Sequence, residues 1–588
     1  MRKRQIKLEI MLLCILFNSI CSCSKYDNIH EIENSPLYEL APSLSLESVV
    51  YHEATKSYII PQSDPYTLEN FKKAYEKLVK GDSEFPITAS QIKELTEYAK
   101  LETTHYALKV YPKNETEQWK IELMDGIKVS YIPFNYIQLA DETKIDGKPL
   151  YTSSGVSIYP EKSHYIEVYD NYETSENIQV DQETIIMPIL YVVWPCDKPL
   201  PDGIDYIVDY EIFIPTYNDQ SKKGTDNQLS IETLQILENE AISLALGISP
   251  KTRYQTKSDV VRTYSGRIYQ YDHLLETNAP IHNLKIQFRL GSNIWETYSQ
   301  SNGYFSITNF IPLEASFSYC FHHPKWKITY ENSTTPITDV WGTADYWWGD
   351  GSQDIYLQPG ASYPQFEIHR AVNYFYNGSH SIEKYFYNEG IRIIASSDTN
   401  SSANAYFYYS SINNAYIRVY YNNQGNECRI ISTVLHELGH FTHFGKKGSH
   451  IGSAYEGYIA THKLIRESYA SYVGWYLGES YYSTLGWTKS SLTQDITGQS
   501  RQLWCKTDDS TAYYSPFFVD LVDDFNQGLY FHGANFESVK HIPYSVIETV
   551  AAECTTWLSL KAFLRDYIGI YYTAPEHSSF IQPYEEWF

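Results

Sequence analysis

The chain has 588 residues, of which 43% are hydrophobic and 20% are charged, so it can form sizeable cores and is not a disordered chain. Its formal net charge is −25 and it has no stripe of lysine and arginine, which argues against nucleic acid as a partner. A chain of this length suggests roughly three to four domains, and its 56 tyrosines favour many strands. We therefore expect a multidomain α+β protein.

The N-terminus has the pattern of an export signal. Four of the first seven residues are basic, and the apolar run that follows, Ile10–Ile20, is too short to span a bilayer. The next residues, Ile20-Cys21-Ser22-Cys23, resemble a bacterial lipobox, in which the last cysteine is lipidated and becomes the mature N-terminus. The resemblance implies a lipoprotein signal peptide over 1–22 and lipidation at Cys23. The alternative is an ordinary signal peptide with incidental cysteines.

Either signal implies an exported protein, and a lipid at Cys23 implies one that is anchored to the bacterial outer membrane or cell surface. Residues 23–46 are polar and carry two prolines, which suits a tether between the anchor and the folded body. The five cysteines beyond the lipobox are odd in number and widely spaced, so they predict no disulfide framework.

Residues 47–260 are predicted to form an α+β domain. Apolar residues at helical spacing predict helices over 67–80, 90–101 and 230–246. Strand-like runs, most of them alternating, occur at 105–112, 126–134, 183–194 and 206–214. We find no catalytic constellation in this domain.

Part of the predicted N-terminal domain resembles a region of known exported lipoproteins. The stretch from Thr104-His105-Tyr106 to Tyr111-Pro112-Lys113-Asn114-Glu115, with helix-rich sequence before it, resembles the N-terminal region of large exported lipoproteins from Bacteroidetes-type bacteria. Those proteins are usually built as metallopeptidases. The resemblance implies nothing about what this domain itself does.

Residues 261–331 are predicted to form a small β-sandwich, because short alternating segments are broken there by Gly, Pro and Asn turns. The opening Gly266-Arg267-Ile268 and the later Asn302-Gly303-Tyr304-Phe305 resemble the carboxypeptidase regulatory-like domain. That resemblance implies a structural or binding appendage without catalytic residues.

Residues 332–588 form the last predicted domain, and they contain the sequence His436-Glu437-Leu438-Gly439-His440. Two histidines four residues apart lie on one face of a helix, so both imidazoles can bind one Zn²⁺, with Glu437 beside them as a general base. Predicted strands at 405–409 and 415–421 precede the helix, as in zincin-like catalytic domains. The alternative is a pair of surface histidines on an amphipathic helix.

A catalytic zinc site needs a third protein ligand. The metzincin form of the motif fails, because its glycine and final histidine positions hold His443 and Lys446. His443 itself is roughly 10 Å along the helix from His436, too far to share one ion. His450 and His462 lie in no recognisable ligand context.

Glu467, in a predicted helix over 464–475, is the better candidate, and Ala470 one turn later is small enough for close packing against the motif helix. The pattern resembles the gluzincin group, whose third ligand is a glutamate on a second helix. The alternative for Glu467 is an ordinary charge on a helix surface.

The predicted ligands are therefore His436, His440 and Glu467 around Zn²⁺, with Glu437 as the catalytic base that takes a proton from the attacking water. Five further residues stay open as candidates: Asp520 or Asp523 to orient a histidine, and Tyr513, Tyr514 or His532 to stabilise the oxyanion. Asp520 and Asp523 can equally be helix-cap or surface residues.

We expect an exported zinc metallopeptidase that acts on protein or peptide substrates. One alternative is a cell-surface binding or adhesion lipoprotein with a non-catalytic metal site, although such a site has no use for Glu437. Another is a zinc amidase that acts on cell-wall or glycopeptide bonds. The sequence does not identify the substrate.

Overall fold

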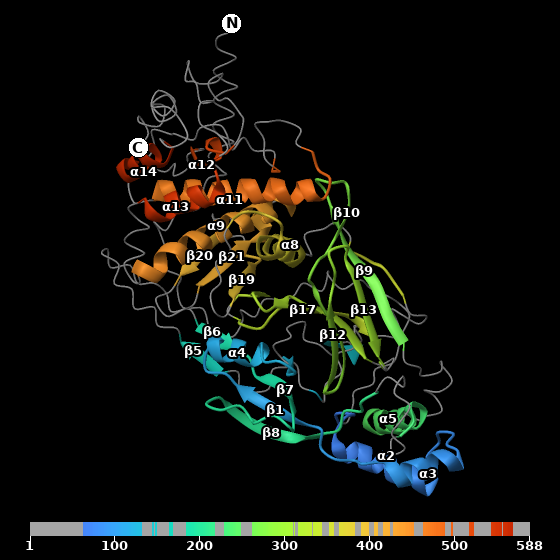
Figure 1. The fold of residues 1–588 in the computed structure, drawn as a ribbon. Helices are drawn as coiled ribbons and strands as arrows, with labels where there is room; N and C mark the ends of the chain where they lie inside the picture. The colour runs from blue at the N-terminus through green and yellow to red at the C-terminus, as the bar shows by residue number, and fades with distance from the viewer. Residues whose placement is uncertain are drawn as a thin grey trace.

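A computed structural model of the chain describes residues 63–131, 134, 144–145, 148–149, 164–167, 184–217, 229–247, 262–309, 311, 315–331, 333–343, 352–357, 364–382, 390–398, 405–409, 415–423, 427–451, 463–488, 496–497, 517–522, 542–554 and 557–568. The predicted export signal, Cys23 and the tether lie outside these residues. The protein is a mixed α+β structure with several sheets, which agrees with the predicted class (Figure 1).

The N-terminal region begins with helices whose ends follow from their capping residues. In α2 (Leu68–Lys80), the Thr67 side chain accepts a hydrogen bond from the Asn70 N–H, and Gly81 ends the helix with a φ of 74°. In α5 (Ile231–Leu246), Ser230 and Gly247 do the same at the two ends. Helix α3 (Ala89–Tyr98) lies beside them. The three predicted helices are therefore confirmed.

The first sheet has the strand order β2-β7-β1-β8 and is antiparallel. Its strands are β1 (His105–Tyr111), β2 (Lys128–Ser130), β7 (Leu190–Pro195) and β8 (Asp205–Ile212). The single run over 183–194 is two strands, because Pro188 has no N–H to continue a ladder. Its first half is β6 (Thr184–Met187), which pairs with β5 (His164–Glu167); β3 (Lys144–Ile145) pairs with β4 (Lys148–Pro149).

The β-sandwich has two sheets that pack face to face. One has the order β10-β9-β13, with β18 also beside β9, and the other has the order β12-β11-β14-β17. The strands are β9 (Arg262–Asp272), β10 (Thr277–Pro280), β11 (Lys285–Leu290), β12 (Asn293–Tyr298), β13 (Tyr304–Asn309), β14 (Ser316–Cys320), β17 (Thr338–Thr343) and β18 (Ile355–Leu357). Tyr264, Phe288 and Phe317 are fully buried between the sheets, and their rings are in contact.

Strand pairing crosses the predicted boundary at residue 331 in both directions. Strands β15 (His322–His323) and β16 (Trp326–Thr329) precede it, yet they belong to the C-terminal sheet. Strands β17 and β18 follow it, yet they pair within the sandwich. The sandwich and the C-terminal sheet therefore exchange segments of chain and are not simply joined end to end.

The C-terminal sheet has the order β15-β16-β19-β21-β20, in which β16, β19 and β21 are parallel and β20 is an antiparallel edge. Its other strands are β19 (Ile391–Ser396), β20 (Ala405–Tyr409) and β21 (Ala415–Tyr420), followed by a short 3-10 turn, Tyr421–Asn423. The helices are α8 (Pro364–Asn377), α9 (Glu427–Ile451), α11 (Lys463–Thr484), α12 (Phe517–Asp520), α13 (Tyr544–Glu553) and α14 (Trp557–Ile568). Figure 1 shows the orange helices α9 and α11 lying along each other on one side of this sheet.

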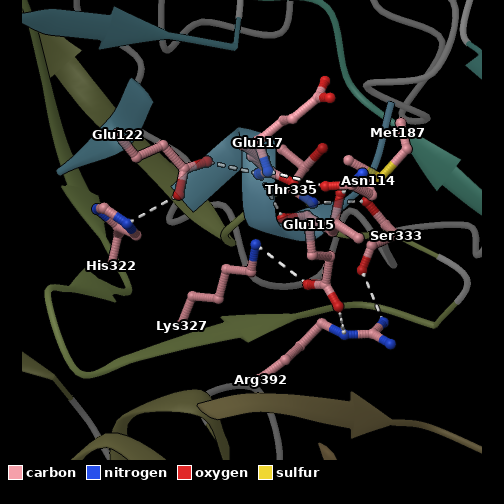
Figure 2. A network of polar contacts seen from close by, with 12 residues as sticks. Asn114, Glu115, Glu117, Glu122, Met187, His322, Lys327, Ser333, Thr335 and Arg392 are labelled. Carbon is pink, nitrogen blue, oxygen red and sulfur yellow. Dashed lines mark hydrogen bonds and ion pairs between the residues drawn. The ribbon is translucent and has the colours of Figure 1, made fainter. Parts of the chain in front are cut away.

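Helix α4 (Glu115–Glu122), for which the sequence analysis predicted no element, joins the N-terminal region to the C-terminal sheet through buried charges. Figure 2 shows Glu115 between Lys327 of β16 and Arg392 of β19. The ion-pair distances are 3.2 Å to Lys327 Nζ and 3.3 Å to Arg392 Nε. Glu122, at the other end of α4, lies 3.1 Å from His322 Nε2. These ion pairs connect α4 to strands β15, β16 and β19 of the C-terminal sheet.

A second buried ion pair joins the sandwich to the C-terminal helices. Arg370 of α8 donates to Asp272 at the end of β9 over 2.6 Å, and both side chains are almost completely buried. Tyr482 of α11 donates to the same Asp272 oxygen over 2.9 Å. Asp272 therefore connects the sandwich to both helices.

Among the described residues, no helix is both long and apolar enough to cross a membrane. The cysteines that the structure describes are free thiols: Cys320, Cys428 and Cys554 are buried, and Cys196 is exposed.

Candidate metal centre

Helix α9 carries the first half of the site, and its apolar side chains hold it against the sheet. Val434, Leu435, Leu438 and Phe441 are completely buried, and the Phe441 ring contacts Phe407 of β20 with 5.9 Å between ring centroids. Because these residues fix the rotation of α9, the other face of the helix presents His436 and His440, whose rings lie 4.8 Å apart. The predicted strands, helix and motif face are thus brought together as expected.

Helix α11 approaches α9 closely because the contact surfaces have very small side chains. A Cβ placed on Gly439 would lie 2.9 Å from the Ala470 Cα, so only glycine fits there without a shift. A Cβ on Gly474 would lie 3.2 Å from the His436 Cβ. The predicted close packing at Ala470 is confirmed, and it places Glu467, three residues earlier, next to the histidines.

Glu467 directs one carboxylate oxygen at both imidazoles. Its Oε2 atom lies 3.4 Å from His436 Nε2 and 3.3 Å from His440 Nε2. The three side chains each offer one ligand atom, and these atoms lie within 4.8 Å of one another. Among the described residues, no other group of three or more His, Cys, Asp or Glu side chains has this arrangement. Two imidazoles and a carboxylate are the donor set of a catalytic zinc site, so the residues present fit the predicted ion.

Burial and neighbouring charges set the protonation of the site. Burial alone would raise the pKa of Glu467, but His440, His436 and Arg466 lower it well below its ordinary value. Burial lowers the pKa of His440 to about 4. The candidate ligands are therefore a carboxylate and, at His440, a neutral imidazole, which are the forms that can bind a cation.

Glu437 has a different environment from Glu467. Burial raises its pKa to about 7, and the nearby Glu467 charge acts in the same direction, whereas His436 opposes the shift. The main-chain N–H of Phe407, on edge strand β20, donates to the Glu437 carboxylate. A carboxyl group with a pKa near neutrality can accept and return a proton, as a general base and acid must.

Three residues around the ligands were not foreseen from the sequence. Arg466 Nη2 donates to Glu467 Oε1 over 2.8 Å, and Ser471 Oγ lies 3.4 Å from His436 Nδ1. Phe407 contacts Glu437 through its main-chain N–H, and no sequence motif indicates such a contact. Ser471 could have been found, because it lies four residues after Glu467 and so faces α9 on the same side. Among the described residues, the buried His440 Nδ1 has no hydrogen-bond partner.

Of the remaining candidates, the structure describes the side chains of His443 and Asp520. His443 faces another direction, and its Nε2 lies 2.9 Å from the carbonyl oxygen of Ala551 on α13. Asp520 is buried in α12, which lies against α11. The other candidates lie outside the described side chains: His450, His462, Tyr513, Tyr514, Asp523 and His532.

Comparison of the chain with protein-family models, with curated proteins and with solved structures found no match.

Proposed function

We propose that the chain is an exported zinc metallopeptidase of the gluzincin type. The observation that carries the proposal is the convergence of Glu467 Oε2 on His436 Nε2 and His440 Nε2, at 3.4 and 3.3 Å, with the Glu437 carboxylate on the same helix as the histidines. A site of this kind, with three protein ligands and an adjacent base, supports hydrolysis better than a structural metal site, which closes its fourth position with a protein ligand.

In this proposal His436, His440 and Glu467 hold the ion. When bound, zinc supplies a Lewis acid that polarises the substrate carbonyl and makes an attacking water more acidic. Glu437 takes the proton from the attacking water on its carboxylate and passes it to the nitrogen of the leaving amine. Its buried position, which raises its pKa to about 7, favours both halves of this transfer.

The edge strand beside Glu437 favours a peptide over other amides. On one side β20 pairs with β21, and no other described strand pairs with its outer side. The Phe407 N–H of this strand contacts Glu437, so the strand runs past the base. An extended peptide can add to a free strand edge through main-chain hydrogen bonds, which would bring its carbonyl groups past the site. The proposed substrate is therefore a protein or peptide, and the proposed location is the cell surface, with a lipid anchor at Cys23.

The test measures zinc content and hydrolysis of casein or a peptide by the full chain and by Glu437→Gln. Glutamine has nearly the same shape but cannot take a proton, so this variant should keep its zinc and lose activity by about 100-fold or more. Glu553→Gln, an exposed change on α13, is the control and should behave as the wild type. A wild-type chain that binds no zinc, or a fully active Glu437→Gln, would disprove the proposal.

A further inference from the structure

Arg466 lies directly beside the proposed ligands but is not one of them. Its Nη2 donates to Glu467 Oε1 over 2.8 Å, and its side chain is only 16% exposed. Among the described residues, Glu467 is the only acid within ion-pair distance of Arg466, and the buried Arg466 Nε has no hydrogen-bond partner. Within the described part of the chain, the ion pair of the guanidinium is with one carboxylate oxygen, Glu467 Oε1.

The two oxygens of Glu467 have different partners. Oε2 faces both histidines, at 3.4 and 3.3 Å, whereas Oε1 faces Arg466. A carboxylate can bind a cation through one oxygen or through both. With Oε1 held by a guanidinium, only Oε2 is directed to the place where the imidazoles converge. The different partners of the two oxygens are seen in the positions of the side chains alone, without a bound ion.

We propose that Arg466 is a positioning residue that keeps Glu467 a one-oxygen ligand. The inference rests on the proposed function, because it assumes that Glu467 binds the metal. The Glu467 side chain is only 7% exposed, so Oε1 has little access to water if Arg466 is removed. The carboxylate would then rotate so that both oxygens face the cation, or Oε1 would stay buried without a partner.

Charge and orientation predict opposite effects of removing Arg466, which makes the proposal testable. A guanidinium close to a dication repels it, so if charge alone mattered, a neutral residue at this position would strengthen zinc binding. If Arg466 acts by orienting Glu467, the neutral residue weakens zinc binding instead. The sign of the change in affinity therefore separates the two roles.

The experiment compares the full chain with Arg466→Met and Arg466→Lys. The zinc dissociation constant is measured by competition with a chelator, and the visible spectrum is recorded for the Co²⁺-loaded proteins. We expect Arg466→Met to bind zinc about 10- to 100-fold more weakly, the usual range for a lost partner of a metal ligand. Its Co²⁺ bands should weaken, as they do when the coordination number rises. Arg466→Lys keeps a charged donor and should stay closer to the wild type on both measurements.

Zinc affinity that is equal or higher in Arg466→Met, or an unchanged Co²⁺ spectrum, would overturn the inference. Arg565→Met removes an exposed arginine on α14 and is the matched control. If Arg466→Met does not fold, as judged by circular dichroism without metal, Arg466→Gln repeats the test with a smaller change and the same predicted sign. A wild-type chain that binds no zinc would instead refute the proposed function, so the two failures are distinguishable.

Discussion

Gly439 of α9 lies so close to Ala470 of α11 that a Cβ on the glycine would be 2.9 Å from the Ala470 Cα. Neither partner is the end of a flexible side chain, so no rotamer change can relieve this contact. The spacing of the two helices therefore depends on the missing side chain of Gly439. Because Glu467 lies one turn before Ala470, the distance between Glu467 and the histidines depends on the same contact.

Gly439→Ala should separate the two helices and weaken the site. Alanine favours a helix over glycine by about 1 kcal/mol, but crowding a packed contact costs about 1–3 kcal/mol, so we expect a net loss of stability. Zinc affinity should fall by about tenfold or more, because the shift acts on the spacing of the ligands. Urea unfolding and chelator competition measure the two effects.

Gly478→Ala is the control on α11 for this prediction. There a Cβ would meet only the side chain of Ile496, at 2.7 Å from its terminal methyl and 3.4 Å from Cγ1, and the methyl can move. We expect unchanged zinc affinity and equal or greater stability in this variant. Equal zinc affinity in Gly439→Ala and Gly478→Ala would show that the helix contact does not set the site.

The proposed ligands could be predicted from the sequence because each lies in a recognisable local pattern. The histidines are four apart on a helix, and Glu467 lies on a second helix with Ala470 one turn later. No sequence pattern indicated a role for Arg466, because a charged residue beside Glu467 in a helix is usually at the surface. Its role depends on where the guanidinium points, which is set by tertiary packing.

The fold was predictable where capping residues and alternation are strong, as at Thr67, Gly81 and Ser230. It was not predictable for α4, whose N-cap Asn114 was visible but whose helix has no regular apolar spacing. Its buried charge partners, Lys327 and Arg392, lie more than 200 positions later in the chain. The exchange of strands across residue 331 could not be predicted either, because the partners of these strands lie far apart in the sequence.

Glu115→Gln should strongly destabilise the protein. The change leaves Lys327, which is 0% exposed, and Arg392, which is 3% exposed, without their shared counterion. Breaking a buried ion pair by removing one partner costs about 3–5 kcal/mol. Urea unfolding at neutral pH measures the loss. Adding Lys327→Met should recover part of it, because one uncompensated charge is removed.

The control for Glu115 is Glu69→Gln, which breaks a solvent-exposed pair with Lys73 on α2. Exposed pairs contribute little, so this variant should unfold at the wild-type urea concentration. Two equally stable variants would mean that the network in Figure 2 does not hold α4 to the sheet.

Glu122 should make stability depend on pH in the acid range. Burial alone would raise its pKa, but Lys327 and His322 lower it from 4.5 to about 2. Between these pH values the unfolded chain binds a proton that the folded chain does not. The contribution of Glu122 is therefore complete above about pH 4.5 and is lost as the pH falls towards 2.

Glu122→Gln should make the free energy of unfolding less dependent on pH in this range, by up to about 1.4 kcal/mol per pH unit. Unfolding in urea at several acid pH values measures the slope. Glu76→Gln, an exposed change on α2, should leave the slope unaltered. A wild-type slope in Glu122→Gln would contradict the assignment.

Asp272→Asn should lower the stability of the protein and, through α11, weaken zinc binding at the proposed metal site. The change leaves the Arg370 guanidinium buried without its counterion and replaces the carboxylate that accepts from Tyr482. We expect a loss of about 3–5 kcal/mol, and a milder loss in Asp272→Asn/Arg370→Met, in which no buried charge remains unpaired. Because α11 also carries Glu467, zinc should raise the melting temperature of Asp272→Asn by less than it raises that of the wild type at the same concentration. An equal rise in both proteins would mean that the sandwich stabilises the fold without supporting the metal ligands.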